Sequence, residues 1–298
     1  MSDQPSRTRR RLLKIGVVAP LLALAPLARA AKGSATPPSS ASHVSGTNTG
    51  GRQPPKVPVI FDALGEIRTV YTMDLVDQIL ESGTRAISIT LTDPKVAQVD
   101  AFDLMMHDLA AYNLYFRKFQ SHYRVSRSLA DIEIARNEGK LAIFYNIQNS
   151  TPVEHDLSRV ALLKSLGLTA MQLTYNDHNL SGSGCSAPRA HGLTPFGRQL
   201  AEQMAIDRML VDLSHAGMKT MSDAIAASPR PIIISHTACK SLRDHPRNTT
   251  DENIRALADR GGVIGMAQMR TFMTDARTNN LDVYFDHIQH AVNVGGVD

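Results

Sequence analysis

Two apolar runs of the sequence each end in a serine and a histidine. Met209–Leu213 leads into Ser214 and His215, and Ile232–Ser235 leads directly into His236. Neutral imidazole is the side chain that most often binds transition metals. If the two runs are neighbouring strands of a parallel sheet, about 4.8 Å apart, side chains at the same depth converge on one ion. The matched pair therefore predicts a metal site at one end of a sheet.

Apolar, β-branched runs alternate with helical patterns along most of the chain. Runs that are apolar almost throughout are typical of strands buried on both faces of a parallel sheet. Strands are predicted at Val57–Phe61, Ala86–Leu91, Leu141–Ile147, Ala170–Thr174, Met209–Leu213, Ile232–Ser235 and Val263–Ala267. Helices are predicted at Met73–Ser82, Val99–Phe119, Leu129–Glu138, His155–Leu166, Pro195–Asp207, Met218–Ala227, Glu252–Arg260 and Leu281–Val294.

This alternation fits either a (β/α)8 barrel or a doubly wound sheet. We favour the barrel because polar residues follow many strands, whereas a doubly wound sheet gathers its site at one switch point. These polar residues are Asp62, Gln148, Tyr175, Asn176, His215 and His236. The predicted fold class is therefore α/β, with a TIM-type barrel.

The C-terminal residues read as a turn that enters another strand. The last predicted helix runs into Val294–Asp298, "VGGVD", after seven strand–helix units where a closed barrel needs eight. An open barrel leaves two strand edges unpaired. We therefore expect the barrel to be truncated before its eighth strand, and residues 1–298 alone to aggregate and to be weakly catalytic. A longer gene product should continue beyond Asp298 and place an acidic residue opposite the two histidines.

The first 30 residues have the pattern of a twin-arginine export signal. Paired arginines in Thr8–Lys14 precede the apolar stretch Ile15–Ala28, and Ala28–Arg29–Ala30 is a small-x-small cleavage site. The stretch is shorter than the roughly 20 residues of a transmembrane helix. The expectation is a periplasmic protein with no stable membrane span after cleavage; an uncleaved anchor is the alternative.

Residues 31–56 are rich in Gly, Ser, Thr and Pro and are predicted to be a disordered linker before a barrel domain at 57–298. Residues 1–56 hold nine Lys and Arg and one acidic residue, which leaves 23 basic and 27 acidic residues in the remainder. The basic pI thus belongs to the N-terminus. We therefore expect no binding to nucleic acid, because such binding needs a basic face on the folded part of the chain.

Several motifs resemble the membrane dipeptidase (renal dipeptidase) family of zinc peptidases over roughly residues 57–298. They are "LTYNDHN" (Leu173–Asn179), "GLTPFG" (Gly192–Gly197), "VDLSHAG" (Val211–Gly217) and "IIISHTACKSLRDHPRN" (Ile232–Asn248). The resemblance implies a (β/α)8 barrel with two zinc ions bridged by a glutamate and a water. It implies that His215 and His236 bind zinc and that Arg247 binds the substrate carboxylate. A guanidinium suits that role because it donates two parallel hydrogen bonds.

The chain departs from the family pattern at three site positions. Leu64 stands where the family has a zinc-binding histidine, Gln148 where it has the bridging glutamate, and Tyr175 where it has the histidine that steadies the oxyanion. A phenol can still donate a hydrogen bond to an oxyanion. Glu66 remains as an acidic residue able to serve as ligand or base, and Asn176 is a candidate substrate-binding residue.

These departures predict one zinc ion where the family has two, held by the two histidines with Glu66 or Gln148 as further candidate ligands. The predicted protein is an exported, zinc-dependent hydrolase that cleaves dipeptides or related small amides with a metal-activated water. The alternative is a catalytically impaired member that binds a small peptide or amide. The sequence leaves open whether the protein is a homodimer and whether Cys185 and Cys239 form a disulfide.

The remaining histidines receive weaker assignments. His178 and His245 are reserve candidates because they lie in loops expected to face the site. The others are expected to be solvated on helices or loops: His107, His122, His155, His191, His287 and His290.

Overall fold

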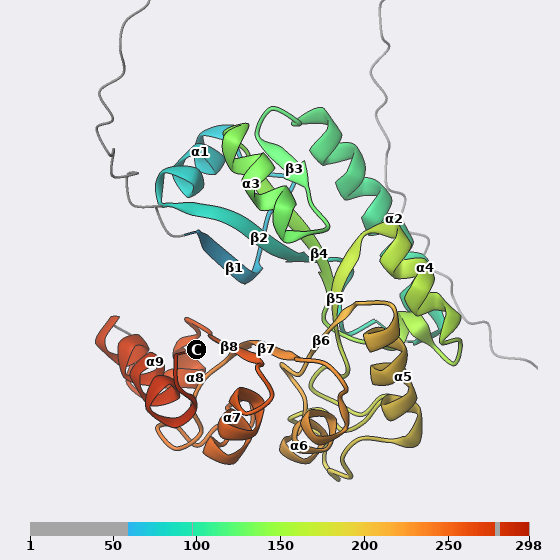
Figure 1. Ribbon diagram of the computed structural model, residues 1–298, viewed down its shortest axis with the longest axis vertical. Coiled ribbons are helices and arrows are strands. Elements are labelled where there is room, and N and C mark those ends of the chain that lie inside the picture. Colours follow the sequence, from blue (N-terminus) through green and yellow to red (C-terminus); the bar gives the residue numbers. More distant parts are fainter. Residues whose placement is uncertain (1–58, 97, 278–280, 298) are drawn as a thin grey trace, which may run out of the picture. The chain divides into compact units, whose positions relative to one another are not determined.

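The computed structural model describes residues 59–96, 98–277 and 281–297 (Figure 1). The predicted export signal and linker lie outside these residues, so both stay predictions. The described residues fall within one compact unit, residues 55–298. None of the helices in this part of the chain is long and apolar enough to cross a membrane.

Seven parallel strands form the main sheet, and each pairs with the next one along the chain (Figure 1). They are β1 (Ile60–Gly65), β2 (Thr84–Thr90), β4 (Leu141–Ile147), β5 (Leu168–Gln172), β6 (Leu210–Asp212), β7 (Ile233–Thr237) and β8 (Val263–Met266). A short additional strand, β3 (Tyr123–Val125), pairs with the start of β4. The sheet curls into a nearly closed barrel, one strand short of a (β/α)8 barrel in the described residues. The predicted fold class is confirmed.

Helices connect successive strands, as right-handed crossovers between parallel strands require. They are α1 (Met73–Glu81), α2 (Gln98–Lys118), α3 (Leu129–Asn137), the 3-10 helix η1 (Thr151–Val153), α4 (Ser158–Leu166), α5 (Pro195–Ile206), α6 (Met218–Ala227), α7 (Asp251–Ala258), α8 (Arg270–Met273) and α9 (Leu281–Gly295).

The central strand β4 shows why the sequences of these strands are mostly apolar. All seven of its residues are buried. Tyr145 faces α2, where its hydroxyl donates to Asn113 Oδ1 at 2.9 Å and its ring lies near Phe116. Ala142 and Phe144 belong to a second cluster, which includes buried residues of α3. Because both faces of the strand are covered, the run is apolar except near its end. There the buried Asn146 donates a hydrogen bond to Ser88 Oγ at 2.7 Å.

Several predicted boundaries were wrong by one to four residues, and three of them show the physical reason. The first strand spans Ile60–Gly65 instead of ending at Phe61, because pairing of Asp62 and Gly65 with β2 carries it through the polar residues. The helix predicted from His155 begins at Ser158, where the Asp156 side chain accepts from the Ser158 N–H at 3.0 Å. The helix expected to begin at Glu252 starts at Asp251, after the cap Thr250. The three-residue strand β3 was missed because it is too short to show a pattern.

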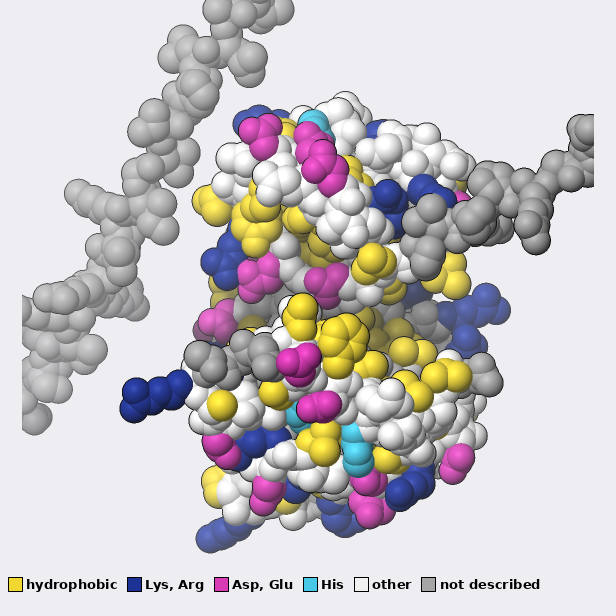
Figure 2. Space-filling view, turned by 90° about the vertical axis from the view of Figure 1, so that its left-hand side faces the viewer, with side chains coloured by type: hydrophobic (Ala, Val, Ile, Leu, Met, Phe, Trp, Pro, Cys, Tyr) yellow, Lys and Arg dark blue, Asp and Glu magenta, His cyan; other side chains and the backbone are white. Residues whose placement is uncertain are grey.

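In the described residues the sheet remains open between β1 and β8. Phe61 on β1 and Val263 on β8 are both exposed large hydrophobic residues. Figure 2, which faces the side of the molecule that carries β1 and α9, shows hydrophobic side chains exposed across its middle. Unpaired edges with exposed apolar residues are sites of edge-to-edge association.

We expect the 298-residue chain to self-associate through this open edge. A lysine on an edge strand opposes such pairing, so Val263→Lys, at a side chain 64% exposed, should shift the protein toward monomer. The change in the free energy of unfolding should stay within about 0.5 kcal/mol. Light scattering over a concentration series measures the effect. Val70→Lys, at an exposed loop position, is the control, and equal association of both variants would exclude the edge as the cause.

Candidate metal and substrate site

A cavity of about 850 Å³ extends along β1 from Ile60 and reaches residues at and after the carboxyl ends of several other strands. Glu66, Gln148, Tyr175, His215 and His236 line it. Glu66, Gln148, Tyr175 and His215 come after β1, β4, β5 and β6 in turn, and His236 lies near the carboxyl end of β7. The structure thus brings five of the seven predicted site residues to one cavity, called the site cavity below.

The two histidine rings face each other within the site cavity. His215 Nε2 lies 2.9 Å from His236 Nε2. The Tyr175 ring stacks on His215 with centroids 4.0 Å apart, and His215 Nδ1 lies 2.7 Å from Asn176 Oδ1. His215 has a φ of 65°, in the left-handed region that non-glycine residues rarely adopt. Such backbone strain is typical of residues held in place for function.

His236 is held from the opposite side by a serine and a carboxylate. Its Nδ1 lies 2.8 Å from Ser235 Oγ, and the Ser235 hydroxyl donates to Asp212 Oδ2 at 2.5 Å. Its backbone N–H donates to Ser214 Oγ at 3.0 Å. Both serines therefore belong to the network beneath the histidines, and neither is placed as a nucleophile.

The hydrogen bonds indicate where each imidazole carries its proton. The Asn176 carbonyl oxygen faces His215 Nδ1 and can only accept. The Ser235 hydroxyl uses its one hydrogen to donate to Asp212, so its oxygen can only accept from His236 Nδ1. Both rings consequently carry the proton on Nδ1. The two Nε2 lone pairs then face each other across 2.9 Å. They repel each other at this distance, and a cation bound to both would remove the repulsion.

Burial keeps the two histidines uncharged. It lowers the pKa of His215 far below its ordinary value, and the positive charge of Arg247 and the nearby His236 lower it further. Burial also lowers the pKa of His236, partly opposed by the negative charge of Asp212. Neutral imidazole is the form that binds metal ions, so the pair is ready for a metal at neutral pH.

Arg247 is a buried cation beside this pair. Its side chain is 6% exposed, its Nη2 donates to the His236 carbonyl at 2.9 Å, and its Nε has no hydrogen-bond partner. The guanidinium packs over the Phe272 ring at 5.1 Å. No carboxylate of the described residues forms an ion pair with it. Burial lowers the pKa of Arg247. A buried charge without a counter-ion is destabilising, which indicates an anion-binding position.

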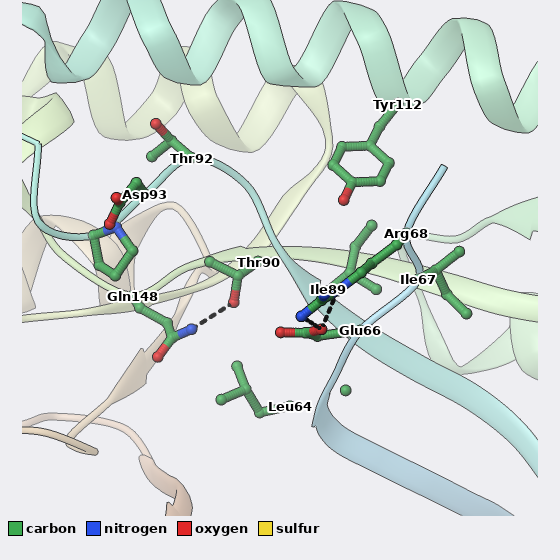
Figure 3. A pocket seen from close by; sticks show the side chains of 12 residues that line it. Leu64, Glu66, Ile67, Arg68, Ile89, Thr90, Thr92, Asp93, Tyr112 and Gln148 are labelled. Carbon is green, nitrogen blue, oxygen red and sulfur yellow. Dashed lines mark hydrogen bonds and ion pairs between the residues drawn. The ribbon is translucent and has the colours of Figure 1, made fainter. Parts of the chain in front are cut away.

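Glu66 and Gln148 also border a second pocket, of about 350 Å³ (Figure 3). Glu66 is turned toward Arg68, whose Nη2 lies 2.6 Å from Glu66 Oε2. Gln148 Nε2 donates to Thr90 Oγ1 at 2.9 Å. In Figure 3 the Leu64 side chain lies below both residues. Neither Glu66 nor Gln148 is hydrogen-bonded to the histidine pair.

The family model of membrane dipeptidases, peptidase family M19, matches residues 72–298. The chain belongs to this family.

Two curated relatives of the membrane dipeptidase family are dipeptidases by name. The chain is 26% identical to the dipeptidase verJ of Clonostachys rogersoniana over 65% of this chain and 50% of that protein. It is 31% identical to an uncharacterized dipeptidase of Schizosaccharomyces pombe over 56% of this chain and 42% of that one. The chain therefore spans about half the length of these relatives.

Solved structures share the barrel. An amidohydrolase from Pseudomonas aeruginosa has a TM-score of 0.73 and 30% identity, covering 80% of this chain and 71% of that one. A metallo peptidase from Rhodobacter sphaeroides has a TM-score of 0.71, 15% identity and coverage of 81% and 84%. At 15% identity, the match to the Rhodobacter sphaeroides protein shows only that the two chains share a fold.

The donor set fits one metal ion better than two. The His215–His236 pair offers two neutral nitrogens aimed at one place, which suits a single transition-metal ion. The described residues contain no group of three or more His, Cys, Asp or Glu side chains that could hold a metal. Leu64 cannot act as a ligand, and the amide of Gln148 carries no charge to bridge two cations. At two of the positions where the resemblance implies metal ligands, Leu64 and Gln148 therefore do not fit, whereas Glu66 still offers a carboxylate.

Several residues lie where the sequence patterns did not place them. His287, expected to be solvated, is 1% exposed; its Nδ1 accepts from the Cys239 N–H at 3.0 Å, because α9 packs against the loop after β7. His178 stacks on His191 and is not among the residues that line the site cavity. Cys185 and Cys239 are free thiols. The supporting roles of Asp212 and Ser235 were missed, although both stand in the motifs around the two histidines.

Proposed function

We propose that the protein is an exported hydrolase that cleaves dipeptides or related small amides with one zinc ion held by His215 and His236. The observation that carries the proposal is the pair of Nε2 lone pairs aimed at one place beside Arg247, a buried cation without a counter-ion. A zinc ion would bind the two histidine lone pairs, and a substrate carboxylate would neutralise the charge of Arg247. Membership of the membrane dipeptidase family supports this class of reaction.

The chain's own residues bind and orient the substrate. Arg247 receives the terminal carboxylate through its forked donors, since a bidentate guanidinium–carboxylate pair is strong and directional. Tyr175 stacks on His215 and lines the site cavity. Burial raises the pKa of Tyr175, so its hydroxyl stays protonated and can donate to the oxygen of the scissile amide. Bound zinc would polarise that amide and lower the pKa of a bound water.

Elemental analysis paired with a dipeptide hydrolysis assay tests this function. We expect about one zinc per chain, lost together with activity in His215→Ala or His236→Ala. His107→Ala, at an exposed position on α2, is the matched control and should change neither. Two equivalents of zinc would show that Leu64 and Gln148 do not prevent a second site. A protein that neither binds zinc nor hydrolyses dipeptides would overturn the proposal.

A second candidate function is binding of a small peptide or amide without hydrolysis. It is favoured by the ion pair between Glu66 and Arg68, which occupies the acidic side chain that could complete a metal site or act as base. Calorimetric titration with a dipeptide distinguishes the two functions. Saturable binding with no product over many hours would favour the binding protein.

Export to the periplasm is also part of the proposal, on the evidence of Arg9, Arg10 and the cleavage site Ala28–Arg29–Ala30. The mature protein should begin near Ala31. N-terminal sequencing of periplasmic material measures this. Membrane-bound protein that retains Met1 would show that the segment is an anchor.

A further inference from the structure

Asp212, at the end of β6, is a buried carboxylate that bonds to both the backbone and the side chains beneath the histidine pair. It is 4% exposed. Its Oδ1 accepts from the backbone N–H groups of Ser214 and Ser235 at 2.9 and 3.0 Å. Its Oδ2 accepts from the Ser235 hydroxyl at 2.5 Å and from Gln172 Nε2 at 3.1 Å. The first oxygen therefore ties β6 to β7, and the second bonds only to side chains.

The second oxygen determines the direction of the next hydrogen bond. Ser235 has one hydroxyl hydrogen, and it donates this hydrogen bond to Asp212 Oδ2. The Ser235 oxygen can then only accept from His236 Nδ1, 2.8 Å away. The proton of His236 is thereby kept on Nδ1, and its Nε2 lone pair faces the site cavity, 2.9 Å from His215 Nε2.

We propose that Asp212 is a positioning residue that acts through the Ser235 hydroxyl to hold His236 in the tautomer whose Nε2 lone pair faces the site cavity. The tautomer follows from the hydrogen bonds alone, whereas its use in binding zinc rests on the proposed function. Residues that orient a metal-binding histidine through its other ring nitrogen generally raise metal affinity. The wrong tautomer would present an N–H to the ion instead of a lone pair.

Asp212→Asn is the most informative variant. Its amide oxygen can keep the two backbone bonds of Oδ1, while its amide N–H₂ would donate to Ser235 Oγ. The Ser235 hydroxyl would then donate a hydrogen bond to His236 Nδ1. The imidazole ring would consequently carry its proton on Nε2. Gln172 can adapt to this change by turning its amide, because its Oε1 has no partner. The variant thus exchanges the tautomer with little change of shape, as an aspartate-to-asparagine change does in a catalytic triad.

Long-range 1H–15N NMR spectra of the zinc-free protein read the tautomer directly. We expect His236 to carry its proton on Nδ1 in the wild type and on Nε2 in Asp212→Asn. Ser235→Ala should give a mixture, and Ser235→Thr should restore the wild-type tautomer because it restores the hydroxyl. Ser126→Ala removes a buried serine hydroxyl bonded to a backbone carbonyl on β3 and is the control. If Asp212→Asn does not fold, the two Ser235 variants decide the question.

Zinc titration of the same proteins measures the consequence. Affinity should fall by about 10- to 100-fold in Asp212→Asn and in Ser235→Ala, and Ser235→Thr should recover it. Wild-type His236 protonated on Nε2, or a tautomer that does not change in the folded variants, would overturn the proposed role of Asp212. If the tautomers change as expected but the wild type binds no zinc, the proposed function fails and the positioning role stands.

Discussion

Arg247→Met is expected to lower kcat/KM for dipeptide hydrolysis by about 100-fold, or about 2.7 kcal/mol. The guanidinium is the buried cation beside the histidine pair, and its Nε has no partner. Its loss removes both donors to the substrate carboxylate, so the effect should fall mainly on KM, as for an interaction made equally in the bound substrate and in the transition state. Steady-state kinetics of the purified variant measures it.

Stability should not fall with activity in Arg247→Met. Methionine fills much of the same volume, and the removal of a buried charge without a counter-ion offsets the loss of the hydrogen bond to the His236 carbonyl. A thermal melt is the check. A dipeptide with an amidated C-terminus supplies the matched control, since the wild type should discriminate against it by a similar factor and the variant should not. A variant that still prefers the free carboxylate would show that Arg247 does not bind it.

The meeting of the two histidines was predictable because each follows the end of an apolar run at the same depth. β6 and β7 pair in parallel with Asp212 opposite Ile233, and His215 and His236 each stand three residues beyond these partners. Equal offsets after neighbouring parallel strands bring side chains together. The barrel followed from the same alternation of strands and helices.

The direction of individual side chains was not predictable. Glu66 was a candidate ligand, yet Arg68, two residues further on, takes its carboxylate. Asp212 reads as one charged residue at a strand end, and its partner Ser235 lies 23 residues away. His287 reads as part of an amphipathic helix, but its burial depends on Cys239 and Met273, which come from other segments. A local ion pair decided the first case, and contacts between distant segments decided the other two.

The second large effect concerns acid stability. Zinc-free protein should lose stability as pH falls below about 6.5, because the two site histidines are buried in the neutral form. Their folded-state pKa values are lowered, so the unfolded chain binds more protons than the native protein between the two pKa values. The free energy of unfolding therefore increases with pH between the two pKa values and decreases as pH falls.

The size of this effect follows from the depressed pKa values. Burial lowers the pKa of His236 to about 4 from an ordinary value of 6.5, and that of His215 lies lower still. Between pH 7 and pH 5 each histidine should therefore remove about 2 kcal/mol, since one pKa unit corresponds to about 1.4 kcal/mol. Denaturant unfolding at several pH values, with a chelator present, measures the slope.

Variants separate the histidines from other titrating groups. The pKa values of Asp131 and Asp251 are lowered by their hydrogen bonds from an ordinary value of 3.8, so these carboxylates lose their contribution only at more acid pH. His215→Gln and His236→Gln should each flatten the slope between pH 7 and pH 5 by about half, because a glutamine does not titrate in this range. His107→Gln, at an exposed position, should leave the slope unchanged. A wild-type protein equally stable at both pH values would show that the histidine pair is not buried in its neutral form, and the lone pairs on which zinc binding depends would then not be available.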